Sequence, residues 1–282
     1  MHSFDLETGR SPAIHLWCTF YSDLANEGLL REYRSFLSEP ERQQELRFHF
    51  ARDRRRYLVT RALVRTVLSR YAEIAPREWV FTPNDYGRPL IANGAAAGQI
   101  SFNVSHTDSL IILAVARGHE LGVDVENIRT RAACIDIADR FFAPAEVSAL
   151  HALPPARQQQ RFFEYWTLKE SYIKARSMGL SIPLDHFSFD LLEDDIGISI
   201  HPDQGDRPQR WRFWQMSLGP EYLGALCAER VSEEKPLLVV RNIVPLISDQ
   251  ALSYTLLRAS KEGLAGEVFH ADTVLSDPRS RE

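Results

Sequence analysis

Two short stretches of this sequence place acidic and basic side chains at spacings that could do chemistry. They read Gly-Val-Asp-Val-Glu at residues 122–126 and Trp-Thr-Leu-Lys-Glu-Ser-Tyr-Ile-Lys at residues 166–174. Alternate side chains of a strand share a face, so Asp124 and Glu126 should face outward together. Residues four apart share a helix face, so Glu170 should lie beside the last lysine of its stretch. Because Mg²⁺ prefers oxygen ligands, the two stretches predict a site for a divalent cation and a phosphorylated substrate.

An ordinary surface role is the alternative for both stretches. Alternating acids often form the solvated face of a strand, and an exposed Glu-Lys pair on a helix contributes only ~0.2–0.5 kcal/mol. The distribution of lysine favours function, because the chain has 29 Arg and only 4 Lys, and two of the four are Lys169 and Lys174. Arginine does not replace lysine where a compact ammonium must meet a phosphate.

Several further segments accompany these two stretches in a consistent order between about Arg52 and Leu184. Together they resemble the motif set of the 4′-phosphopantetheinyl transferases of the Sfp type, and the chain is identified from them as a member of that family. The further segments are Pro-Asn-Asp-Tyr-Gly-Arg-Pro at 83–89, Phe-Asn-Val-Ser-His at 102–106, Phe141-Phe142 with Glu146, and Gly179-Leu180 with Pro183-Leu184.

The resemblance implies a specific architecture. It is an α+β fold made of a pseudo-twofold pair of similar α/β lobes, the 4′-phosphopantetheinyl transferase fold, with the metal site at the lobe interface. The first lobe would span residues 1–118 and the second residues 119–245. Residues 246–282 form a C-terminal extension outside the family's motif set, which we expect to be partly disordered. In the extension, residues 249–260 are expected to be helical, and residues 276–282 lack core-forming side chains and should be disordered.

Apolar periodicity and turn residues predict the elements that must position the site. Helices are expected at 24–37, 39–50, 52–71, 133–142, 145–152 and 158–178. Strands are expected at 14–20, 80–81, 100–104, 110–116 and 122–126, followed by a β-rich section over 186–240. This order of strands and helices is typical of an α+β protein.

The resemblance also implies an activity, that of a holo-[acyl-carrier-protein] synthase. The enzyme would transfer the 4′-phosphopantetheine group of coenzyme A to a serine of an acyl, peptidyl or aryl carrier protein, with Mg²⁺, and release 3′,5′-ADP. Polyketide synthases, nonribosomal peptide synthetases or fatty acid synthases would supply the carriers. The alternatives are a Mg²⁺-dependent phosphohydrolase of coenzyme A or nucleotides, a non-catalytic carrier-binding module, and a scaffold whose acidic pairs are only surface.

Individual roles follow from the matching motifs. Asp124, Glu126 and Glu170 would hold Mg²⁺, or Mn²⁺ in its place. Glu170 is the first candidate for the base that accepts the serine proton, directly or through water, and Glu146 is the second. Lys174 and His106 would neutralise the phosphates. The resemblance assigns coenzyme A binding to Arg56, Gly87, Arg88, Ser105, His106 and Lys174.

The carrier protein needs a surface of its own. The segment after the Asp-Val-Glu strand combines basic with apolar side chains, and we expect it to receive an acidic carrier. Its members are Ile128, Arg129, Arg131, Ile135, Arg140 and Phe142.

Composition limits the remaining possibilities. A net charge of −5 argues against a nucleic-acid binder held by general basicity. Cys18, Cys134 and Cys227 show no metal or disulfide spacing, which predicts reduced cysteines. The longest apolar run, 110–116, is far below the ~20 residues that span a bilayer, and no signal peptide is evident. We therefore expect a cytoplasmic protein that binds neither membrane nor nucleic acid. The pseudo-dimer within one chain that the resemblance implies predicts a monomer.

Overall fold

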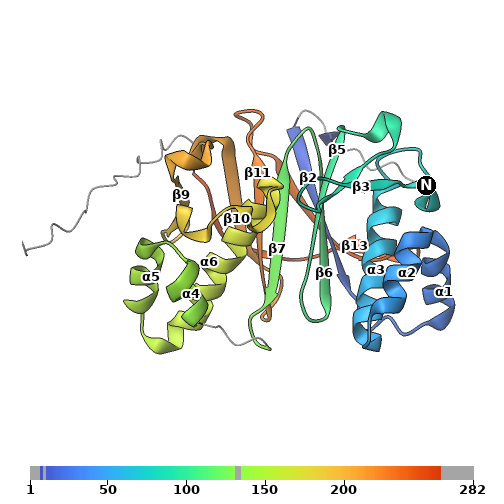
Figure 1. Cartoon of the computed structure of the whole chain (residues 1–282), viewed down its shortest axis with the longest axis horizontal. Coiled ribbons are helices and arrows are strands. Elements are labelled where there is room, and N and C mark those ends of the chain that lie inside the picture. The colour runs from blue at the N-terminus through green and yellow to red at the C-terminus, as the bar shows by residue number, and fades with distance from the viewer. Residues whose placement is uncertain (1–6, 9–10, 131–134, 262–282) are drawn as a thin grey trace, which may run out of the picture.

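The computed structural model describes residues 7–8, 11–130 and 135–261 of the chain. Two β-sheets occupy the middle of the molecule, with helices α1–α3 on one side and α4–α6 on the other (Figure 1). This mixed architecture confirms the predicted α+β fold. Within the described ranges, every helix is too short or too polar to span a lipid bilayer.

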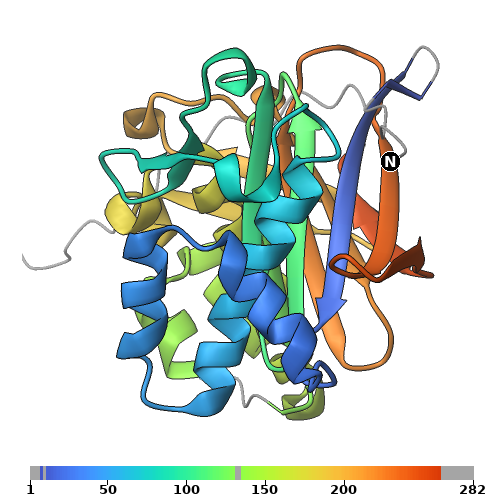
Figure 2. The ribbon, with the colours of Figure 1, turned by 90° about the vertical axis from the view of Figure 1, so that its right-hand side faces the viewer.

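The first sheet has the strand order β13-β12-β2-β6-β5, and β1 extends it beside β2. Only β12 and β2 run parallel. Three helices lie over one face (Figure 2), where Tyr33 and Leu63 share a core with Trp17 and Leu113 of the sheet. The elements are β1 (Glu7–Thr8), β2 (Ser11–Phe20), β5 (Ile100–His106), β6 (Leu110–Arg117), β12 (Leu237–Val244), β13 (Ser248–Ala251), α1 (Glu27–Phe36), α2 (Glu39–Arg47), α3 (Ala51–Leu68) and the hairpin β3 (Phe81–Pro83) and β4 (Pro89–Ile91).

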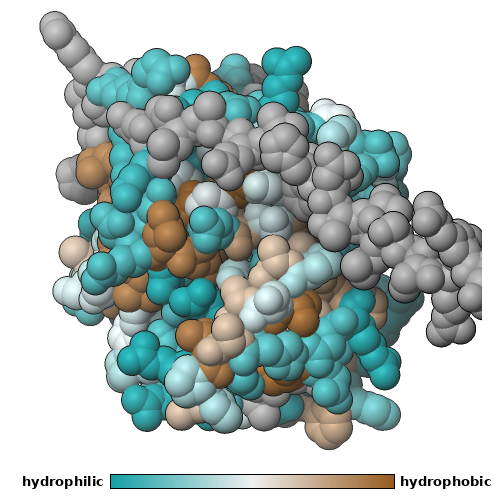
Figure 3. Space-filling model, turned by 90° about the vertical axis from the view of Figure 1, so that its left-hand side faces the viewer, coloured by the Kyte–Doolittle hydropathy of each residue, from teal (hydrophilic) through white to brown (hydrophobic). Residues whose placement is uncertain are grey.

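The second sheet has the strand order β14-β10-β11-β7, all antiparallel. Helix α6 packs along it, and α4 and α5 pack on α6. The outer surface on this side carries apolar patches among polar side chains (Figure 3). The elements are β7 (Leu121–Asn127), β10 (Trp211–Ser217), β11 (Tyr222–Glu229), β14 (Thr255–Ala259), α4 (Ile135–Phe141), α5 (Pro144–His151), α6 (Pro155–Arg176) and the hairpin β8 (Phe187–Leu191) and β9 (Ile196–Ile200).

A shared core joins the two sheets. Along β6, Ile111 and Leu113 pack towards the helices, whereas Ile112 and Ala114 pack with Val123 of the second sheet. Successive strand residues point to opposite faces, and both faces of β6 are covered. The unbroken apolar run of this strand is the consequence.

The C-terminal extension differs from its prediction. Residues 249–260 are not helical, because residues 248–251 pair with β12 and residues 255–259 pair with β10. Strand β12, counted with the second lobe in the prediction, pairs with β2 in the first sheet. The predicted lobe boundaries remain predictions, and the predicted disordered segment 276–282 lies outside the described residues.

Helix α6 lies so close to β7 that only glycine fits between them. A Cβ atom added at Gly122 would lie 2.1 Å from the carbonyl oxygen of Ser171. Glycine at this position lets the helix backbone approach closely, because it has no side chain to keep the two backbones apart. This contact brings Glu170 and Lys174 of the helix towards Asp124 of the strand.

Replacing Gly122 with Ala should therefore cost about 3 kcal/mol of unfolding free energy, because two backbones would have to separate. Urea unfolding would measure the loss. Gly224→Ala is the matched control on the neighbouring strand β11, since its Cβ would meet nothing nearer than 3.6 Å. Equal stability of the two variants would contradict the close-approach interpretation.

Candidate active site

A cleft between α3 and α6 gathers most of the predicted site residues. Its volume is about 450 Å³, with α3 on one side, α6 on the other, and residues of β5 and β7 between them. Its lining consists of Arg56, Tyr57, Thr60, Arg61, Val104, Ser105, His106, Asp124, Glu126, Trp166, Glu170 and Lys174.

Asp124 and Lys174 form an ion pair at the centre of the cleft. Lys174 Nζ lies 2.6 Å from Asp124 Oδ1 and donates to Ser105 Oγ at 3.0 Å and to the Val123 carbonyl at 3.2 Å. Ser105 Oγ donates to the same Asp124 oxygen at 2.8 Å. The other oxygen, Asp124 Oδ2, is buried and has no hydrogen-bond partner within the described part of the chain. An unsatisfied buried carboxylate oxygen is costly, which marks it as a place for a ligand.

Glu126 and Glu170 add two carboxylates to this centre. Glu126 is buried and accepts a long hydrogen bond of 3.4 Å from Thr107 Oγ1. Burial and the nearby charges of Asp124 and Glu126 raise the pKa of Glu170, although Lys174 opposes the shift. The three predicted carboxylates therefore line one cleft and influence one another electrostatically.

The expectation that Asp124 and Glu126 face outward is wrong. They do share one face of β7, but both residues are buried, and each has only 5% of its surface exposed. The reason is that α6 and β5 both pack against β7. Periodicity predicts which side chains share a face, but not what covers that face.

The donor set of the cleft fits a hard divalent cation. Among the described residues, no three His, Cys, Asp or Glu side chains stand close enough to enclose a metal by themselves. Mg²⁺ does not need such a cage, since it usually takes one or two carboxylates together with waters and substrate phosphates. The unpartnered Asp124 Oδ2, with Glu126 and Glu170 in the same cleft, meets that requirement.

Basic groups from the first sheet and its helices line the opposite wall. Arg56 pairs with Asp53 at 3.2 Å and extends into the cleft near His106. Desolvation of the ring, helped by the positive charges of Arg56 and Lys174, lowers the pKa of His106. His106 is therefore largely neutral at pH 7 and able to donate a hydrogen bond without adding charge.

Gly87 and Arg88 lie in a neighbouring cavity of about 290 Å³, which shares Val104, Glu170 and Lys174 with the cleft. Gly87 has a φ of 85°, as the turn between β3 and β4 requires. The guanidinium of Arg88 donates to the Lys174 carbonyl at 2.9 Å and also bonds Ser177 Oγ. Arg88 therefore holds the end of α6 against the first sheet. The same side chain is the one predicted to contact coenzyme A, so it would have both a structural and a binding role.

Glu146 does not join the cleft. Its carboxylate is fully buried and pairs with Lys169 at 2.7 Å. Both oxygens also accept backbone hydrogen bonds, from Ala143 and Phe189. The structure therefore contradicts Glu146 as a candidate base, and it places Lys169, the other lysine of the motif, in the core rather than in the site.

The predicted carrier-binding segment is only partly accessible. Phe142 is buried, and Ile128 and Ile135 pack against the core of the second sheet. Arg129 and Arg140 are exposed. The third basic residue of the segment, Arg131, lies outside the described residues.

Sequence reasoning missed residues that link the two sheets beneath the site. Asn103 Oδ1 accepts a hydrogen bond from the Val123 backbone at 2.9 Å, and Thr107 Oγ1 accepts one from Asn127 at 3.0 Å. Asn103 and Ser105 lie on β5 and Thr107 directly follows it, so the period-two pattern could have shown that they share a face. Nothing local showed that β7 would lie opposite.

Comparison with known proteins adds independent information. A family model described as the 4′-phosphopantetheinyl transferase superfamily matches residues 120–227, and one described as 4′-phosphopantetheinyl transferase, N-terminal, matches residues 27–118. A 4′-phosphopantetheinyl transferase of Bacillus subtilis is 36% identical over 192 residues, which are 68% of this chain and 82% of that protein. The 4′-phosphopantetheinyl transferase Sfp of Bacillus subtilis strain 168 is 34% identical, with 70% and 84% covered. HetI of Nostoc sp. PCC 7120, also a 4′-phosphopantetheinyl transferase, is 33% identical, with 61% and 71% covered.

The ion pair in the cleft generates a stability prediction. Lys174→Met should lower the free energy of unfolding by about 2–3 kcal/mol, because it leaves the buried Asp124 carboxylate without its cation. Adding Asp124→Asn should recover much of that loss, which a double-mutant cycle in urea would detect. Lys261→Met is the matched control, since its pair with Asp194 is half-exposed and should contribute less than ~0.5 kcal/mol. Additive effects of Lys174→Met and Asp124→Asn would contradict direct coupling.

Proposed function

Because this chain belongs to the 4′-phosphopantetheinyl transferases of the Sfp type, and is thus a transferase, we propose that it carries out the following reaction. It transfers the 4′-phosphopantetheine group of coenzyme A to a serine of an acyl, peptidyl or aryl carrier protein. The reaction uses Mg²⁺, or Mn²⁺ in its place, and releases 3′,5′-ADP. Polyketide, nonribosomal peptide or fatty acid synthases provide the carrier.

The observation that supports this reaction most directly is the unpartnered Asp124 Oδ2 in a cleft with two further carboxylates. In the proposal, Asp124, Glu126 and Glu170 hold the metal ion directly or through water, since no three described side chains of this kind enclose it by themselves. Bound Mg²⁺ supplies charge neutralisation for the pyrophosphate of coenzyme A, which is the dominant requirement of phosphoryl transfer.

The basic wall of the cleft has a complementary role. Arg56 and Lys174 are cations on opposite sides of the cleft, and both line it beside His106. A pyrophosphate between them would be neutralised from both sides, while the neutral His106 ring donates a hydrogen bond. Arg56 and His106 come from α3 and β5, whereas Lys174 and the carboxylates come from α6 and β7.

The transfer step needs a base near the carrier serine. The serine oxygen forms a bond to the phosphorus that carries pantetheine, and the bond from that phosphorus to the oxygen of 3′,5′-ADP breaks. The serine proton passes to Glu170, directly or through water. With Glu146 enclosed by Lys169, Glu170 is the remaining candidate of the two.

The proposal predicts which carboxylates the reaction needs. Asp124→Asn and Glu170→Gln should each slow transfer by about 10²-fold or more, because they remove charge from the site without changing side-chain size. Asp194→Asn is the control, since this acid is exposed and outside the cleft. The measurement is the intact mass of an apo carrier protein after incubation with the chain, coenzyme A and Mg²⁺, with and without chelator.

Each outcome separates one reading from another. Transfer that persists in the presence of chelator, or in the Asp124→Asn variant, would refute the assignment of these carboxylates to a metal ion. Release of phosphopantetheine without any carrier would indicate a phosphohydrolase, and carrier binding without transfer would indicate a binding module. A scaffold would show no heat-stabilisation by coenzyme A with Mg²⁺.

A further inference from the structure

The corner between α2 and α3 exposes large apolar side chains beside the cleft. We use "the α2–α3 corner" for Leu46, Arg47, Phe50, Arg52 and Arg55. Leu46 is 66% exposed and Phe50 is 68% exposed. Single exposed apolar residues are ordinary, but two within five positions beside a cleft suggest an interaction surface.

Phe50 has no explanation in the helix that it begins. It is the N-cap of α3 with extended backbone angles, and it makes no side-chain capping hydrogen bond. Ser, Thr, Asp and Asn stabilise this position, and replacing them with an apolar residue generally costs about 1 kcal/mol. The helix would therefore be more stable with Ser, Thr, Asp or Asn at this position, and the exposed ring is free of a capping role.

The corner is also basic on a chain that is acidic as a whole. Residues 45–56 hold five Arg and two acids, a net charge of 5 − 2 = +3, whereas the whole chain carries −5. Both acids are engaged, Glu45 with Arg34 at 2.9 Å and Asp53 with Arg56 at 3.2 Å. Arg52 has 78% of its side chain exposed and reaches Asp53 only at 3.9 Å.

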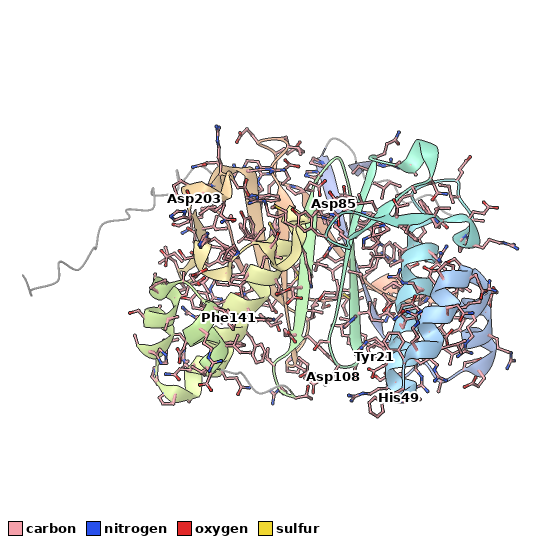
Figure 4. All side chains as sticks on the ribbon, viewed as in Figure 1. Tyr21, His49, Asp85, Asp108, Phe141 and Asp203 are labelled. Atoms are coloured by element: carbon pink, nitrogen blue, oxygen red, sulfur yellow. The ribbon has the colours of Figure 1, made fainter. Side chains whose placement is uncertain are left out.

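The corner continues directly into the cleft. The ring of Phe48, between Arg47 and Phe50 in the sequence, packs on the ring of Tyr57 with centroids 5.3 Å apart. Tyr57 and Arg56 line the cleft. Figure 4 labels His49, of the loop between α2 and α3, at the lower end of the molecule in this view.

We propose that the α2–α3 corner is a docking surface for the carrier protein, receiving an acidic, partly apolar face next to the serine that is modified. The inference rests on the proposed function and names the surface that this function uses. Phe50 and Leu46 provide apolar contact, and the arginines attract acidic side chains and orient the carrier towards the cleft.

Phe50→Ser separates docking from folding. Serine is a favourable N-cap, so the variant should unfold at the same temperature or a higher one. The KM for the carrier should nevertheless rise about tenfold, as expected when an exposed aromatic anchor is removed. The KM for coenzyme A should not change. A carrier KM equal to wild type, in a stable variant, would overturn the proposal.

Charge reversal tests the arginines. Arg47→Glu with Arg52→Glu should raise the carrier KM about threefold to tenfold, and this difference from wild type should shrink at high salt. Arg77→Glu is the matched control, an exposed arginine of the same half of the chain that lines neither cavity. Equal effects of the corner variant and of Arg77→Glu would contradict docking at the corner.

A binding measurement distinguishes this proposal from the proposed function itself. A fluorescently labelled carrier with its serine replaced by alanine should bind wild type more tightly than Phe50→Ser. Failure of wild type to modify any carrier would refute the proposed function, whereas normal modification by all corner variants would refute only the docking surface. Binding of the corner to anionic phosphatidylserine vesicles, with an unchanged carrier KM, would reassign it to a membrane and overturn the proposal.

Discussion

The contact on which the site depends is the close approach of α6 to β7 at Gly122. It places the acidic and basic positions of the helix against the acidic positions of the strand, with no side chain between the two backbones. The first half of the chain then holds the far end of the same helix, because Asn84 and Arg88 bond backbone atoms at Ser177 and Lys174. The cleft is therefore defined from both sides by contacts to one helix.

This arrangement concentrates negative charge where water is partly excluded. Asp124, Glu126 and Glu170 share the cleft, and Lys174 is the cation that contacts Asp124 directly. Burial, together with the charges of Asp124 and Glu126, raises the pKa of Glu170. Neighbouring carboxylates repel one another, which destabilises the fold. A cation bound among them would reduce that repulsion, which explains why they are gathered here. The unpartnered oxygen of Asp124 shows where in the cleft that relief is most needed.

Local periodicity predicts part of this site well and another part not at all. That Asp124 and Glu126 share a face follows from the geometry of a strand alone. Their burial does not, because it depends on β5 and α6, which local sequence does not place beside the strand. Local sequence also does not predict the Glu146–Lys169 ion pair, because nothing local shows that these two motif residues are buried in the core. Residues 249–260 form strands because they pair with β12 and β10, and such pairing overrides local propensity.

The two lysines of the motif show what separates a packing role from a site role. Each ammonium has three donors, and the protein supplies three acceptors to each. Lys169 bonds Glu146 and two backbone carbonyls, all within the second half of the chain. Lys174 bonds Ser105 on β5 as well as Asp124 and the Val123 carbonyl on β7, so its acceptors come from both sheets.

A phosphate can reach Lys174 only by displacing one of these three acceptors, and the 3.2 Å bond to the Val123 carbonyl is the weakest. The 2.6 Å contact with one oxygen of Asp124 would then persist, and the other oxygen has no hydrogen-bond partner among the described residues. The geometry of the site is in this way tied to the relative position of the two sheets.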